Sequence, residues 1–454
     1  MAFVITKEEG IFRDFTFDVE GKELEQAYRT ILNELKANAV VDGFRKGKAP
    51  EWIIKSKFKN YILEGLVEDF AKKAYESAKE LGFDVMDIRI NLEKSNFSEK
   101  DMKLTMEGYI EIFPVIEAEK LKDLEGVELE IPAFELTDEM VDKAIKYTLE
   151  DKATLEPKEG PIEEDDYVVI DYTVTDRQDN EKVSQKLSGV LKELGLRKDL
   201  YNELLGKKEG DTIKLENVPI QETEDENAPK VDIEVKVESV KKKVYPELTD
   251  ELVKELGLGE NVQEAIENTR KRLQNYLERQ KEEAKINAVT KYLLEEYKDI
   301  AETSRTEAIR IANLVYEEEI NRLNAMFDLS SFDENTLKAI EKSAYDKSVR
   351  EGITSAKTRS ILVSYAKKFG IEVSDEDIKK YIDEQVEAYK DMLPDNQKDE
   401  ASLQRLRENI ESYFLREDRK SVLLKDILAS KAMDKILEII KFKENSALKE
   451  ENVE

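Results

Sequence analysis

Hydrophobic and polar positions alternate with different periods along the first part of the chain. Apolar residues fall at every second position from Phe15 to Val19, which predicts a half-buried strand. Residues 22–38 then place their apolar side chains on one helical stripe, and a further helix is expected over 61–81. Strict alternation returns over 102–112. This succession of strand, helices and strand predicts an α+β domain.

The middle of the chain follows the two-residue period of strands. Residues 167–174 form a β-branched and aromatic run, and residues 231–237 alternate apolar with charged side chains. Between them, a turn is expected over 204–211. The preceding stretch, 113–150, is expected to be a connector with a short strand and a helix that Thr137 caps. A small β-rich domain therefore follows the connector.

The C-terminal part of the chain is poor in residues that break helices. Eight of the nine prolines lie between Pro50 and Pro246, and only four glycines follow residue 246. Such a stretch is expected to be almost entirely helical. Ser374 and Asp377 have the spacing of a capping box, which marks the start of a helix. The Lys- and Glu-rich tail from about residue 443 is expected to be frayed.

These patterns together predict an α+β multidomain protein. The expected order is an α+β domain over 1–112, the connector over 113–150, a β-rich domain over 151–243 and an elongated all-α domain over 244–454. A chain of 454 residues is long enough for about three domains of ordinary size.

The high content of charged residues favours an extended molecule over a compact one. Charged residues make up 39% of the chain and the net charge is −30, whereas an ordinary globular domain is about 25% charged. An extended, helix-rich molecule has the surface to carry this charge, and a compact enzyme does not. The chain as a whole repels nucleic acid, so any contact with RNA must come from a local basic segment.

The absence of two residue types excludes several kinds of chemistry. The chain has no Cys and no His, which removes thiolate metal sites, cysteine nucleophiles and the commonest general base. Paired carboxylates remain possible, but 103 acidic residues make any one pair unremarkable, and no metal site and no cofactor are expected. No apolar run reaches the ~7–15 residues of a signal peptide or the ~18 of a membrane span. The expected location is the cytoplasm, away from membranes.

The most informative segment is the loop from Gly43 to Pro50, which reads G-F-R-K-G-K-A-P. Two glycines and a proline predict a tight connection between helices, on which one aromatic ring and three cations are displayed. Residues 36–59 carry seven Lys or Arg against two acidic residues, a local balance of +5. These cations suit phosphate, and Phe44 offers an anchor for a protein groove or a face for stacking. The alternative interpretation is a solvated connection that is basic by chance.

This segment resembles the ribosome-docking motif of trigger factors, G-F-R-x-G-K-x-P, at every fixed position. Leu155–Tyr172 and Lys241–Gly257 resemble the entries into that family's middle and C-terminal domains, so the resemblance covers essentially the full length. It implies a ribosome-binding α+β N-domain, an FKBP-like β-rich middle domain and an all-α chaperone domain with arms. The residues that it assigns to ribosome binding are Gly43, Phe44, Arg45, Lys46, Gly47, Lys48 and Pro50.

The resemblance also implies partners. Phe44, Arg45 and Lys46 would contact a ribosomal protein and the adjacent rRNA at the exit tunnel of the large subunit. Unfolded nascent polypeptides would be the clients, and no nucleotide would be needed. The sequence agrees with the last point, because it contains no GxxxxGK[ST] loop. Whether free molecules form a homodimer stays open.

The resemblance leaves two interpretations of the middle domain, which in this family can be a peptidyl-prolyl isomerase. The candidate isomerase pocket comprises Tyr172, Val183, Leu200 and Leu204. Tyr172 matches the first aromatic of such a site, but the pocket floor reads Arg197 to Tyr201 where the family has Ile-Pro-Gly-aromatic-Glu. Polar residues there would admit water. A fold kept as a clamp or peptide-binding surface is therefore favoured over a functional isomerase.

Apolar side chains near helix junctions are candidates for client binding. They are Met326, Phe327, Leu329, Tyr389, Met392 and Leu393. By resemblance the helices form an open cradle, which must expose apolar side chains, and the flexible side chain of Met suits promiscuous binding. The alternative is that these residues only pack helix ends together.

Three functions remain in competition. The favoured one is an ATP-independent, ribosome-bound chaperone that shields nascent chains and assists their folding. The second is a prolyl isomerase whose helices present the substrate. The third is a helical scaffold or adaptor without client activity.

Overall fold

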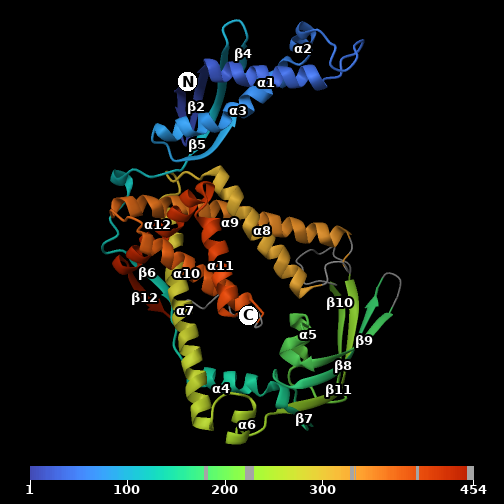
Figure 1. The fold of residues 1–454 in the computed structure, drawn as a ribbon. Coiled ribbons are helices and arrows are strands. Elements are labelled where there is room, and N and C mark those ends of the chain that lie inside the picture. Colours follow the sequence, from blue (N-terminus) through green and yellow to red (C-terminus); the bar gives the residue numbers. More distant parts are fainter. Residues whose placement is uncertain (178–181, 220–229, 328–331, 333, 395–397, 447–454) are drawn as a thin grey trace. The chain divides into compact units, whose positions relative to one another are not determined.

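The computed structural model of the chain describes residues 1–177, 182–219, 230–327, 332, 334–394 and 398–446 (Figure 1). The chain divides into two compact units, one formed by 1–133 with 282–454 and the other by 134–281. This division passes through the segment 113–150, which the sequence predicts as a connector. The finer domain boundaries expected from the sequence stay a prediction.

The first unit begins with an antiparallel five-stranded sheet in the order β1-β2-β5-β3, with β4 paired to β5. Its strands are β1 Ala2–Glu9, β2 Phe12–Glu20, β3 Val85–Ile90, β4 Asn96–Ser98 and β5 Lys103–Ile112. Across the central pair, Phe17 faces Met106 and Val19 faces Leu104. All four side chains are buried, because alternate residues of neighbouring strands share one face of a sheet.

Helices α1 Lys22–Asn38 and α3 Lys59–Glu80 pack on this sheet, and the short helix α2 Glu51–Lys57 lies between them in sequence (Figure 1). Five residues of α1 are buried, and all five belong to its apolar stripe: Leu24, Tyr28, Ile31, Leu32 and Leu35. The helix and strand predictions for this domain are therefore confirmed. The predicted strand over 102–112 is one residue too long at its start. Met102 has φ 45° and lies just before β5, which begins at Lys103.

The second unit holds a five-stranded antiparallel sheet in the order β10-β11-β8-β9, with β7 paired to β11. Its strands are β7 Thr154–Pro157, β8 Tyr167–Asp176, β9 Lys182–Val190, β10 Thr212–Pro219 and β11 Lys230–Val244. The apolar positions of 231–237 are all buried, as their alternation predicts. The helices of this unit include α4 Asp138–Thr148, α5 Lys198–Leu204 and α6 Asp250–Glu255. Thr137 caps α4 by accepting a hydrogen bond from Met140 N at 3.2 Å.

Long helices dominate the rest of the described chain, as the scarcity of breakers predicts. They are α7 Val262–Glu296, α8 Arg305–Met326, α9 Glu334–Lys368, α10 Asp375–Met392, α11 Glu400–Phe414 and α12 Glu417–Ile439. The capping box at Ser374 and Asp377 is present at the start of α10. Among the residues described, none of these helices combines the length and the apolar character needed to cross a bilayer. Short 3₁₀ turns occur at Ala118–Lys120, Glu150–Lys152 and Leu191–Glu193.

Helices α8 and α9 approach each other closely because α9 carries small residues at every fourth position. Ala344, Ser348, Gly352, Ala356 and Ser360 are all buried. A side chain at Gly352 would meet the backbone oxygen of Ala308 in α8 at 2.5 Å. The residue must therefore be glycine for the two helices to pack at this distance.

The end of the chain departs from its expected form. Residues Lys441–Asn445 form a strand, β12, that pairs in parallel with β6 Glu128–Pro132. Lys441 N also donates to Val127 O at 3.0 Å. The prediction of a frayed tail is therefore wrong for residues 443–445, because β6 supplies the missing hydrogen-bond partners. Residues 447–454 lie outside the described part of the chain.

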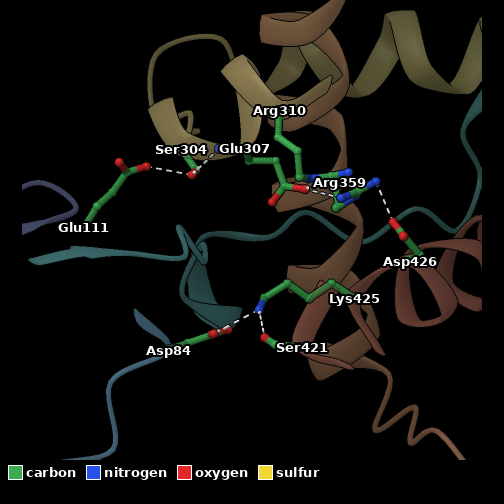
Figure 2. A network of polar contacts seen from close by, with 9 residues as sticks. All are labelled: Asp84, Glu111, Ser304, Glu307, Arg310, Arg359, Ser421, Lys425 and Asp426. Carbon is green, nitrogen blue, oxygen red and sulfur yellow. Dashed lines mark hydrogen bonds and ion pairs between the residues drawn. The ribbon is translucent and has the colours of Figure 1, made fainter. Parts of the chain in front are cut away.

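A buried polar network joins β5 to the helices of the same unit (Figure 2). Glu111, which is 3% exposed, accepts from Ser304 Oγ at 2.6 Å, from Thr306 N at 3.1 Å and from Thr306 Oγ1 at 2.8 Å. Ser304 is also the N-cap of α8 and accepts from Glu307 N. A carboxylate from β5 thus lies at the N-terminus of α8, where the helix dipole favours negative charge.

The same network continues through α9 to α12 (Figure 2). Glu307, which is 1% exposed, pairs with Arg310 at 3.0 Å and with Arg359, and Arg359 also pairs with Asp426 at 2.5 Å. Burial raises the pKa of Asp426, and the charge of Arg359 opposes that shift. These contacts hold the end of β5 against helices that are distant in sequence.

A second contact of the same kind joins α12 to the residue before β3 (Figure 2). Lys425, only 5% exposed, donates to Asp84 at 2.9 Å and to Ser421 at 2.5 Å. Its ammonium also lies 4.9 Å from the centre of the Phe113 ring. A buried cation with these three partners holds the helix in one position against the sheet domain.

Candidate functional site

The predicted docking loop is built from two consecutive turns. Phe44 N donates to Val41 O at 3.0 Å, and Lys48 N donates to Arg45 O at 2.9 Å. Each turn has a glycine at its third position, Gly43 with φ 83° and Gly47 with φ 76°. Glycine adopts this left-handed conformation without the steric cost that a Cβ brings. The two glycines of the motif are therefore required by the backbone of the loop.

The side chains of the loop point to solvent. Figure 1 shows the connection between α1 and α2 extending beyond the end of α1. Every residue from Asp42 to Lys48 is exposed, and Phe44 retains 40% of its accessible surface. Ala49 is half-buried and packs against the core, and Pro50 precedes α2 as its N-cap. The structure thus brings the seven predicted ribosome-binding residues together on one exposed loop.

Ion pairs brace the two helices that flank this loop. Lys36 in the last turn of α1 and Lys55 in α2 both pair with the Glu51 carboxylate, Lys55 at 2.7 Å. Lys55 also pairs with Glu99, which follows β4. Hydrogen bonds from Lys36 and then Lys55 lower the pKa of Glu51 to about 2. The pKa of Lys55 is raised, first by its hydrogen bond to Glu51 and then by that to Glu99.

Pairing leaves the surface around the loop with unmatched positive charge. Asp42, the other acidic residue of segment 36–59, pairs with Lys57 at 3.2 Å. Both acidic residues of the segment are therefore matched by cations. The cations of the segment that have no carboxylate within ion-pair distance in the described part of the chain are Arg45, Lys46, Lys48 and Lys59. These four charges are available to an anionic partner.

The four candidate isomerase residues lie in different environments. Leu200 and Leu204 in α5 are fully buried in the core of the second unit. Tyr172 on β8 is half-buried against the same core, whereas Val183 on β9 is 64% exposed. The two leucines fill the core, and Val183 faces water. Tyr172 is thus the member of the set that combines contact with the core and access to solvent.

Charged groups lie near the ring of Tyr172. Burial raises the pKa of its hydroxyl, while Arg197 lowers it and Asp199 raises it through their charges. Arg197 pairs with Asp199 at 2.6 Å and donates to Pro219 O at 2.7 Å. An ion pair therefore lies close enough to Tyr172, the first residue of the candidate pocket, to influence its hydroxyl.

The predicted client-binding residues lie at the ends of two helices. Met326 and Phe327, at the end of α8, are 63% and 48% exposed. Tyr389 in α10 is 51% exposed, and Leu393, the C-cap of α10, is half-buried. Leu329 and the side chain of Met392 lie outside the described residues. In the described part of the chain, the exposed members of the set keep about half or more of their surface accessible to solvent.

Helices α8 and α9 expose further apolar side chains that were not predicted from the sequence. Ile309, Leu314, Tyr345 and Ile353 are each exposed by 48–60%. The available signal was the apolar residues on more than one face of these helices. With the end of α8, these residues give the helical part several apolar patches surrounded by charge.

Comparisons with known proteins find similarity to trigger factors. Residues 1–148 match the family model described as bacterial trigger factor protein. A trigger factor of Aquifex aeolicus (strain VF5) is 30% identical over 438 residues, which cover 96% of this chain and 86% of that protein. A trigger factor of Chloroherpeton thalassium is 29% identical over 371 residues, covering 80% and 82%. A solved trigger factor chaperone structure is 21% identical, with a TM-score of 0.38 over 96% and 99% of the two chains.

Proposed function

The chain belongs to the trigger factor family of ribosome-associated folding chaperones, and we propose that it docks on the ribosome through the loop Gly43–Pro50. The docking site would be the exit tunnel of the large subunit. Emerging nascent chains would be the clients in the cytoplasm, and they would bind the helical part without any need for ATP.

The observation that carries this proposal is the exposed loop with its unmatched charge. A chain of net charge −30 is repelled by rRNA. The loop gives three cations without carboxylate partners, Arg45, Lys46 and Lys48, together with the exposed ring of Phe44. Cations contact phosphate, and an aromatic ring contacts a base or an apolar groove. The ion pairs of Glu51 link the two helices that flank the loop.

Charge reversal in the loop tests this proposal. We expect Arg45→Glu with Lys46→Glu to lower the affinity for ribosomes about tenfold or more, because each lost phosphate contact weakens binding and reduces its salt dependence. The measurement is co-sedimentation with ribosomes over a salt series. Because both residues are exposed and unpaired, the circular dichroism spectrum should not change. Unchanged co-sedimentation would contradict the proposal.

A control for net charge is Lys22→Glu with Lys72→Glu, which makes the same change in charge and also breaks the exposed pair between Lys72 and Glu76. Lys22 begins α1, about 24 Å from the loop end of that helix. The pair between Lys73 and Glu23 places Lys72 at the same end of α1. We expect this variant to bind ribosomes like the wild type. Both variants should still suppress the aggregation of a refolding enzyme without ribosomes, which a scaffold lacking client activity would not do.

Client binding fits the apolar side chains that the helices expose. Met326, Phe327, Ile309 and Tyr345 lie in water on helices whose buried faces are already packed. Small apolar patches within a charged surface bind an unfolded chain weakly and release it when it buries its own apolar residues. No bound nucleotide is needed for such exchange.

The second unit serves this function best as a structural or peptide-binding module. An isomerase site of the FKBP type favours the twisted amide through apolar, water-poor walls. The Arg197–Asp199 ion pair beside Tyr172 and the exposure of Val183 oppose such an environment. We therefore assign the chaperone function to the docking loop and the helices.

A further inference from the structure

Trp52 is an exposed aromatic residue directly beside the docking loop, and the folding core does not account for it. It is the only Trp in the chain, and it is 71% exposed. A Trp side chain usually buries 150–250 Å² in a core or an interface. The buried position of α2 is filled by Ile54, which is 1% exposed. The packing of α2 therefore does not need the indole of Trp52.

The segment that carries Trp52, residues 36–59, is rich in exposed apolar side chains and cations, and both of its acidic residues are paired. Val40 and Phe44, which precede Trp52 in the same basic segment 36–59, are 73% and 40% exposed. The neighbouring Glu51 is paired with two lysines, so its charge is offset. Aromatic rings interleaved with unpaired cations are typical of surfaces that bind single-stranded RNA, where bases stack on the rings and cations meet the phosphates.

We propose that Trp52 stacks on an unpaired base of ribosomal RNA and so extends the docking site from the loop onto helix α2. This inference rests on the proposed docking function and adds a residue that the motif does not contain. RNA is the favoured partner because the segment offers four cations without carboxylate partners among the described residues: Arg45, Lys46, Lys48 and Lys59. An apolar groove of a ribosomal protein could bind the ring of Trp52, but such binding would not require the four cations.

Substitutions at Trp52 separate stacking from simple apolar contact. Trp52→Leu keeps an apolar side chain and removes the ring, and we expect it to weaken ribosome binding about fivefold or more, since stacking on one base contributes about 1–3 kcal/mol. Trp52→Phe keeps a ring and should bind within about threefold of the wild type. Because both changes are uncharged, the slope of affinity against salt should stay that of the wild type.

Tyr147 provides the control for loss of an exposed aromatic residue. It is 82% exposed on α4, in the other compact unit. We expect Tyr147→Leu to bind ribosomes like the wild type. Circular dichroism of all variants should match the wild type, because the replaced rings are exposed.

The partner of Trp52 is identified by photo-crosslinking of the full chain on ribosomes. With a benzophenone amino acid in place of Trp52, we expect a crosslink that ribonuclease trims to a short nucleotide adduct. A crosslink confined to ribosomal protein, or equal binding of the wild type and Trp52→Leu, would overturn the stacking proposal. Docking through the loop would still hold in that case if Arg45→Glu with Lys46→Glu loses binding. If both Trp52→Leu and the double variant Arg45→Glu with Lys46→Glu bind ribosomes like the wild type, both proposals are refuted.

Discussion

Removal of the Glu111 carboxylate should loosen the start of α8 from the sheet domain. Glu111 receives hydrogen bonds from the hydroxyls of Ser304 and Thr306 and from Thr306 N, and it lies at the N-terminus of α8. In Glu111→Ala these donors lose their acceptor in a site where Ser304 is 1% exposed.

The magnitude follows from the type of bond. A hydrogen bond to a charged group contributes about 1.5–3 kcal/mol, and breaking a buried charged contact costs about 3–5 kcal/mol. Three bonds to one carboxylate are not additive, so we expect Glu111→Ala to lower the free energy of unfolding by about 3 kcal/mol. Glu111→Gln keeps an acceptor oxygen but loses the charge that the helix dipole favours, and should cost about 1–1.5 kcal/mol.

Urea unfolding followed by circular dichroism measures the global effect, and hydrogen exchange at Thr306 and Glu307 measures the local one. The control is Glu107→Gln on the same strand, whose carboxylate has no partner among the described residues and which should change stability by less than about 0.5 kcal/mol. Equal unfolding midpoints and equal exchange rates for Glu111→Ala and the wild type would refute the reasoning. A larger loss of stability in Glu111→Gln than in Glu111→Ala would also refute it.

Two further outcomes are expected. Because the pKa of Glu51 is lowered to about 2, its carboxyl carbon should keep the NMR shift of a carboxylate down to about pH 3, well below the ordinary value of about 4.3. The contribution of this carboxylate to the stability of the folded state is therefore fully present above about pH 4.3 and is lost as the pH falls toward 2. Because Lys36→Met removes one hydrogen-bond donor, it should raise the pH at the midpoint of the Glu51 titration. In a protease-coupled assay on a proline peptide, the full chain should not exceed the uncatalysed rate. Rapid turnover that Tyr172→Ala abolishes would show that the second unit is an isomerase.

Local patterns predicted most elements because they depend on residues only a few positions apart. The stripe of α1 and the alternation of 231–237 each place apolar side chains on one face, and these faces are the ones buried. The two glycines of the docking loop are local too, since each supplies a positive φ within a single turn. The fold class and the family were therefore readable from the sequence.

Exposure and long-range contacts could not be read in the same way. In α2, Ile54 is buried and Trp52 is exposed, and both are large apolar residues that the local sequence does not distinguish. The candidate pocket residues Leu200 and Leu204 were matched by position, yet α5 places both in the core. Burial depends on which surfaces meet, and a sequence pattern does not specify the partner surface.

The sequence by itself determined the periods of the strands and helices, the glycine turns of the docking loop and its local positive charge. Only the tertiary structure decided that Glu111 meets the start of α8, 193 residues away from Ser304, and that residues 441–445 pair with β6. Helix and turn preferences act over about four residues. Contacts such as these form when distant elements are brought together by the packing of their apolar faces, so no local pattern encodes them.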